Sequence, residues 1–145
     1  MPIKSFRGLI ANGGQQTIHL RTNNGSTGYR IVKFELMTNE PGNAQQELVA
    51  KIYKVEQTSV PASSAKIDFS DNTLLAAGMF IQSTTYYSHY QTTIFDNEIF
   101  NQDIYVTHTD NDGSDPVNYY IELEQIKLDL NENTVATLKD IRNVA

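Results

Sequence analysis

Apolar and polar side chains alternate with a period of two along several short segments of the chain. In one of them, Val32, Phe34 and Leu36 lie on one side of an extended backbone, and Lys33 and Glu35 lie on the other. This period is typical of a strand with one buried face, so the pattern predicts β-strands. The segments that show it are 17–21, 29–36 and 48–55.

Three further segments are rich in apolar, β-branched or aromatic residues. Segment 74–81 is continuously apolar, which favours a short strand buried on both faces. Residues 94–95 and segment 104–107 combine isoleucine with valine or aromatic side chains, and these residue types also favour strands. We therefore expect three more strands in the middle of the chain.

Segment 118–128 has the clearest alternation, but its apolar side changes part-way along. The apolar positions are first Tyr119, Ile121 and Leu123, and then Ile126 and Leu128. A shift of one residue moves side chains to the other face of a strand. We expect a β-bulge near Glu124 and Gln125, or a bend that carries the chain into a second sheet.

Turn-forming residues separate these segments and define the fold class. Glycine, asparagine, aspartate and proline cluster at 12–14, 40–43 and 110–113, and such clusters mark turns. Many short strands with frequent turns predict an all-β protein, built as a single antiparallel β-sandwich domain over residues 1–145. A jelly roll is our first choice of topology, and an immunoglobulin-like sandwich is the second.

The two ends of the chain have their own patterns. Residues 1–12 form either the first strand or an N-terminal arm that becomes ordered on a partner. Near the other end, Val135, Leu138 and Ile141 recur every three residues, which predicts a short C-terminal helix over 131–143.

Charge and composition exclude two classes of partner. The chain has 145 residues and a net charge of −6, and its 11 Lys and Arg residues are scattered instead of clustered. Proteins that bind phosphate backbones usually concentrate basic residues on one surface, so we expect no nucleic-acid partner. The longest apolar stretch, 74–81, is too short to cross a bilayer, so we expect no membrane partner either.

Catalytic chemistry finds little support in the sequence. The chain has no Cys, its serines do not occur in a G-x-S-x-G motif, and it has no His-x-His pair of the kind that metal-dependent jelly-roll enzymes use. We therefore expect no enzymatic activity and no cofactor.

One acidic segment contains weak candidates for a metal site. His108, Asp110 and Asp112 alternate along an extended chain and could reach one ion. The segment 110–115 also resembles the start of an EF-hand calcium loop, but it lacks the Gly expected at its sixth position and the Glu expected at its twelfth. A solvated acidic turn is the competing interpretation, and we expect no metal here.

Two segments are candidates for protein contact. Segment 83–92 contains Tyr86, Tyr87, His89 and Tyr90 among small polar residues, a composition typical of adaptable contact surfaces. We expect it to form a long exposed loop, unless the tyrosines fold back over an edge of the sandwich. Phe6 and Arg7, near the N-terminus, are the second pair of candidates.

Five segments together resemble small virion proteins of marine tailed bacteriophages, including phages of cyanobacteria. These segments are KSFRG at 4–8, GYRIVKF at 28–34, FSDNTLL at 69–75, IFDNEIFNQDI at 94–104 and NYYIELE at 118–124. The resemblance covers most of the chain and implies a structural protein of the virion, most specifically a capsid cement or decoration protein. Proteins of this kind are commonly β-rich and often trimeric, and they lie where shell subunits meet.

The expected function follows from this resemblance. The protein would be made in the host cytoplasm, bind the major capsid protein on the capsid surface and associate with itself as a trimer. One alternative is a virion protein of the tail, the connector or a fibre. Another is a glycan-binding sandwich in which the tyrosines of segment 83–92 stack on sugar rings.

Overall fold

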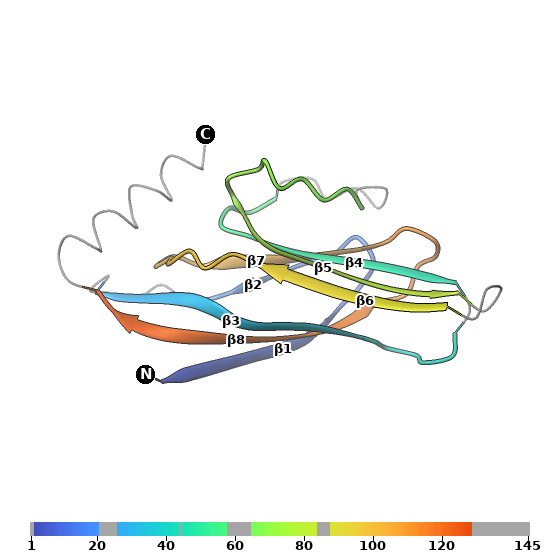
Figure 1. The fold of residues 1–145 in the computed structure, drawn as a ribbon, viewed down its shortest axis with the longest axis horizontal. Coiled ribbons are helices and arrows are strands. Elements are labelled where there is room, and N and C mark those ends of the chain that lie inside the picture. The colour runs from blue at the N-terminus through green and yellow to red at the C-terminus, as the bar shows by residue number, and fades with distance from the viewer. Residues whose placement is uncertain (1, 21–25, 44, 58–64, 84–87, 129–145) are drawn as a thin grey trace.

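The computed structural model describes residues 2–20, 26–43, 45–57, 65–83 and 88–128. This part of the chain contains strands and connections but no helix, which confirms the all-β prediction. The strands form two antiparallel sheets that pack together as a sandwich (Figure 1). The predicted helix over 131–143 lies outside the described residues.

The smaller sheet has three strands in the order β1-β8-β3. Its strands are β1 (Ile3–Ile10), β8 (Val117–Lys127) and β3 (Thr27–Thr38). Residues 3–10 are therefore a strand and not an arm, because β1 pairs with β8 along its whole length, from Ile3 opposite Glu124 to Ile10 opposite Val117.

The larger sheet has five strands in the order β2-β7-β4-β5-β6. Its strands are β2 (Gln15–Ile18), β7 (Ile104–Asp110), β4 (Gln46–Tyr53), β5 (Leu74–Ser83) and β6 (Ser88–Phe95). Strand β5 is buried on both faces only in its first half, because Met79, Phe80 and Ile81 are partly exposed. The prediction for segment 74–81 is therefore correct at its start and wrong at its end.

One core lies between the two sheets. Alternate side chains of β3 and β8 face alternate side chains of β4, β5 and β7, as a period of two requires. Leu48, Ile52, Ile104, Ile121 and Leu123 are completely buried. Burial of a side chain of this size contributes roughly 1.5–3 kcal/mol, so this contact stabilises the sandwich.

The register shift in the smaller sheet lies on β3 and not on β8. Pairing of β3 with β8 shifts register between Ile31 and Lys33, so Val32 is an extra residue in β3. Val32 is only partly buried, whereas Ile31 is in the core, so grouping Val32 with Phe34 was wrong. The predicted bulge near Glu124 was also wrong, since Glu124 pairs regularly with β1.

Glutamine side chains join the two sheets at both sides of the sandwich. On one side, Gln16 of β2 donates a hydrogen bond from Nε2 to the Leu9 carbonyl oxygen of β1, at 2.7 Å. On the other side, Gln91 of β6 donates from Nε2 to the Leu36 carbonyl oxygen of β3, at 2.8 Å. These bonds hold the sheet edges together, so the middle of β6 has a fixed position relative to β3.

Among the described residues, no helix is both long enough and apolar enough to span a membrane.

Candidate functional site

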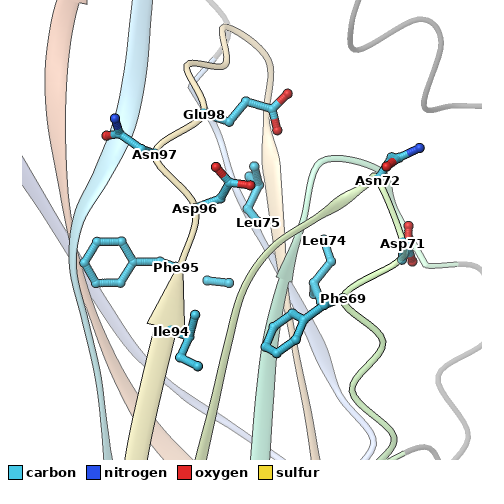
Figure 2. A pocket seen from close by; sticks show the side chains of 11 residues that line it. Phe69, Asp71, Asn72, Leu74, Leu75, Ile94, Phe95, Asp96, Asn97 and Glu98 are labelled. Carbon is cyan, nitrogen blue, oxygen red and sulfur yellow. The ribbon is translucent and has the colours of Figure 1, made fainter.

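A groove of about 940 Å³ lies at the end of the larger sheet, where β5 begins and β6 ends. One wall belongs to the loop 65–73 that leads into β5, and the other is segment 94–98. Figure 2 shows Asp71 on the first wall and Asp96 on the second. The antiparallel pairing of β5 with β6 brings these two distant parts of the sequence together.

The loop wall is built from two consecutive turns that repeat the same chemistry. Asp68 Oδ1 accepts hydrogen bonds from the backbone N (2.9 Å) and Oγ (2.6 Å) of Ser70. Asp71 Oδ1 accepts the equivalent bonds from Thr73, at 2.9 and 2.7 Å. Backbone bonds from Asp71 to Asp68 and from Leu74 to Asp71 close both turns, each at 3.2 Å. Such aspartate-centred turns fix the loop locally.

Three apolar side chains are exposed at this groove. Phe69 is 68% exposed, Ile94 is 53% exposed and Phe95 is 38% exposed. Figure 2 shows Phe69 and Ile94 on one side of the end of β6, with Phe95 extending to the other side. Phe69 occupies the second position of the first turn, so the turn geometry holds an aromatic ring outward. Exposed aromatic side chains on rigid supports are typical anchors of protein contacts.

Three carboxylates line the groove beside these apolar side chains. Glu98 forms an ion pair with Lys54 at 2.9 Å, and the Lys54 side chain is only 2% exposed. Asp71 and Asp96 form no ion pair with any residue in the described part of the chain. The groove therefore combines an apolar surface with net negative charge.

Behind the loop lies a buried polar cluster on the outer face of β4. Lys51 Nζ donates a hydrogen bond to the Lys66 carbonyl oxygen at 2.7 Å. Burial lowers the pKa of the Lys51 ammonium, while the charge of Asp71 acts in the opposite direction. Burial also raises the pKa of the Tyr53 hydroxyl, and the charges of Asp71 and Asp68 add to this effect. Lys51 and its carbonyl partner tie the loop to the sheet.

The candidates Phe6 and Arg7 lie on the smaller sheet, away from this groove. Phe6 is partly buried and packs against the core, so little of its surface remains for a partner. Arg7 is exposed on the outer face and lines a second groove of about 720 Å³ together with Leu9, Met37 and Tyr120. Of the two, Arg7 is thus the residue that is placed for contact.

Residues 88–92 of the tyrosine-rich segment belong to a strand, so the expected long exposed loop is wrong for this part. Strand β6 begins at Ser88 and pairs antiparallel with β5. Tyr90 is 52% exposed on β6. Tyr86, Tyr87 and the side chain of His89 lie outside the described residues. Arg7 and Tyr90 belong to different sheets, so the structure does not bring the two predicted contact sites together.

His108, one of the weak metal candidates, is a buried residue of β7. Its Nδ1 lies 3.1 Å from the Val49 carbonyl oxygen and its Nε2 lies 2.8 Å from the Asp115 carbonyl oxygen. Both ring nitrogens therefore face backbone acceptors, and the ring joins β4 to the loop after β7. This is a structural role.

Asp110, the last residue of β7, has a similar role, and its surroundings suit an anion. Its carboxylate accepts hydrogen bonds from the backbone N of Glu47 (3.2 Å), Asp112 (3.1 Å) and Asp115 (3.0 Å). A carboxylate that is already bonded to several N–H groups is poorly placed to ligate a cation. In the described part of the chain, no three His, Cys, Asp or Glu side chains form a group that could hold a metal ion.

Sequence reasoning missed the groove residues, although a signal for one of them was present. The motif Asp-x-Ser followed by Asp-x-Thr at 68–73 predicts two aspartate-centred turns, and Phe69 is the residue inside the first. The sequence contains no such signal for the exposure of Ile94. Which face of β6 is left uncovered depends on the position of β6 in the sandwich, and that position is fixed by its pairing with β5.

No protein-family model matches the chain, and no curated protein matches it.

Proposed function

We propose that this is a non-enzymatic virion structural protein, most specifically a capsid cement or decoration protein that binds the major capsid protein and stabilises the assembled shell. The observation that carries the proposal is the groove, where exposed Phe69 and Ile94 stand on a rigid turn and a paired strand. Two of the segments on which the resemblance to phage virion proteins rests, 69–75 and 94–104, line this groove. The proposal includes self-association as a trimer on the capsid surface.

The strand order supports a jelly roll as the finer description of the fold. In a jelly roll, an eight-stranded antiparallel ribbon pairs the first strand with the eighth, the second with the seventh, the third with the sixth and the fourth with the fifth. Three of these pairs are present as hydrogen-bonded neighbours: β1 with β8, β2 with β7 and β4 with β5.

The fourth pair is present as a contact between the sheets. Strand β6 is hydrogen-bonded to β5 in the larger sheet, but Gln91 of β6 still bonds to the Leu36 carbonyl oxygen of β3 at 2.8 Å. We interpret the fold as a jelly roll in which the sixth strand has moved from the smaller sheet to the larger one. Jelly rolls are frequent in viral capsid proteins, which is an argument by fold analogy.

The proposed role requires surface contacts and no catalytic group. The one buried histidine of the described residues, His108, has both ring nitrogens directed at backbone carbonyl oxygens, which supports this proposal. A cement protein binds the assembled shell more tightly than the separated subunits, and mass action then stabilises the shell. Many identical copies make even modest single-site affinity sufficient.

The test is the copy number of this protein in purified virus particles, measured by quantitative mass spectrometry relative to the major shell protein. We expect a count comparable with that of the shell subunits. A count of about a dozen per particle would overturn the capsid assignment and favour a tail, connector or fibre protein. Absence from the particle would overturn the virion assignment.

A further inference from the structure

We propose that the groove between loop 65–73 and segment 94–98 binds a basic segment of a partner polypeptide. In this arrangement an apolar side chain of the partner contacts Phe69 and Ile94, and a Lys or Arg beside it faces Asp71 and Asp96. The inference rests on the proposed function, because it assigns the surface through which the protein would contact its shell partner.

The charges of the groove favour a basic occupant. Of the three carboxylates, only Glu98 has a cation in contact, and that cation, Lys54, is buried behind the groove with 2% of its side chain exposed. Lys51 lies behind the same loop, with its ammonium held by the Lys66 carbonyl oxygen. The surface that a partner would meet therefore carries the negative charge of Asp71 and Asp96, and the whole chain has a net charge of −6.

The same charges disfavour two other classes of ligand. A nucleic acid would bring phosphates against carboxylates, which repel each other. A neutral sugar could stack on Phe69, but it would cover Asp96 without supplying a cation, and covering an unpaired charge is costly. A polypeptide with Lys or Arg beside an apolar residue satisfies both parts of the groove, since it brings an apolar contact and an opposite charge.

The geometry supports an anchored contact instead of a diffuse electrostatic one. Phe69 is fixed by the turn that Asp68 and Ser70 close, and Ile94 is fixed by its pairing with Ala77 of β5. Anchors that are already ordered lose little conformational entropy when a partner binds. The carboxylates then contribute mainly to specificity and to the rate of association.

The experiment uses a library of random 12-residue peptides selected on the immobilised full-length protein and counter-selected on the same support without protein. We expect the enriched peptides to carry Lys or Arg next to a large apolar residue. Their affinity should fall at least about tenfold in Phe69→Ala, and about two- to fivefold in Asp96→Asn with a weaker dependence on salt.

Two variants on other surfaces are matched controls. Ile3→Ala removes an apolar side chain that is 51% exposed but lies at the start of β1 on the smaller sheet. Asp112→Asn removes an exposed carboxylate from the loop after β7. Neither should change peptide affinity, and circular dichroism and thermal unfolding should show that all four variants are folded.

Three results would overturn the inference: enriched peptides without basic residues, equal binding to Phe69→Ala, or equal loss of binding in the two control variants. Selective binding of a neutral oligosaccharide that is lost in Phe69→Ala would also overturn it, in favour of a glycan site. The copy-number measurement does not depend on the groove. A high copy number with a failed peptide selection would thus retain the capsid role and place the contact elsewhere.

Discussion

Lys54 and Glu98 form an ion pair whose two ends differ in burial. The distance from Lys54 Nζ to Glu98 Oε1 is 2.9 Å, and the side chains are 2% and 16% exposed, respectively. At this distance the attraction is roughly 6 kcal/mol for an effective dielectric constant of about 20. Desolvation costs several kcal/mol for each ion, so the net contribution of the pair is small. Removing one partner should therefore reveal mainly the desolvation cost of the other.

The two single variants should differ because the group left behind differs in burial. Glu98→Gln leaves an almost fully buried ammonium without its counter-ion, and we expect it to lower the free energy of unfolding by about 3–5 kcal/mol. Lys54→Met leaves a carboxylate that reaches water, so we expect a smaller loss of about 1–3 kcal/mol. The double variant Lys54→Met/Glu98→Gln has no buried charge at this place and should lie within about 1 kcal/mol of the wild type.

Urea denaturation at neutral pH measures these differences, and the double-mutant cycle gives the coupling energy. The ion pair of Arg30 with Glu124 is the control, because its distance is also 2.9 Å but its arginine side chain is 35% exposed. Arg30→Met should cost no more than about 1 kcal/mol. A loss of stability in Glu98→Gln no larger than that in Lys54→Met would refute this explanation, and so would a double variant that loses the sum of the two single effects.

Three further predictions test the core, the buried lysine and the loop after β7. A Cβ atom at Gly78 would lie 2.9 Å from Thr93 Cγ2 and 3.1 Å from Leu36 Cδ1, so Gly78→Val should cost at least about 1–3 kcal/mol by calorimetry, and an unchanged melting temperature would contradict it. Because the folded pKa of Lys51 is lowered from 10.5, the unfolded chain binds more protons just below that pH, and stability should rise with pH there. Lys51→Met should flatten this rise in urea denaturation at a series of pH values below 10.5, and parallel curves for the variant and the wild type would refute the prediction. Asp110→Ala leaves backbone N–H groups without their acceptor and should cost roughly 2–3 kcal/mol in urea denaturation. Added Ca²⁺ should not stabilise the wild type, and a stabilisation of the wild type that Asp110→Ala abolishes would support a metal site.

The strands could be predicted from the sequence because a buried face imposes a period of two. This signal located most of the strands of both sheets, but it failed at Val32. Val32 is the extra residue in β3, so Ile31 and not Val32 lies on the buried face together with Phe34. The change of apolar side in segment 118–128 does not mark this bulge, because Glu124 and Gln125 pair regularly with Arg30 and Tyr29. An extra residue in β3 changes which β3 side chains face the core and leaves the faces of β8 unchanged.

The candidate site was harder to predict, because exposure depends on what covers a residue. Ile94 and Phe95 were correctly predicted to belong to a strand, yet both are exposed, since β6 is at the edge of its sheet. His108 and Asp110 have the residue types of a metal site, but backbone groups of distant segments occupy their polar atoms. Composition gives the chemistry that a side chain can perform, whereas the partners that the fold supplies decide whether the side chain is available.

The two sheets carry different contact chemistry on their outer surfaces, and this bears on the proposed function. The larger sheet has the acidic groove with Phe69, and the smaller sheet has Arg7 and Met37 beside Tyr120, whose ring lies 5.8 Å from the Lys33 ammonium. A protein that binds a single shell subunit would bind it equally well before and after assembly, so it would not stabilise the shell. A cement protein must therefore contact at least two molecules at once, either two shell subunits or one subunit and another copy of itself. A sandwich with a separate contact surface on each sheet meets this requirement, because the rigid core between the sheets holds both surfaces in a fixed relation.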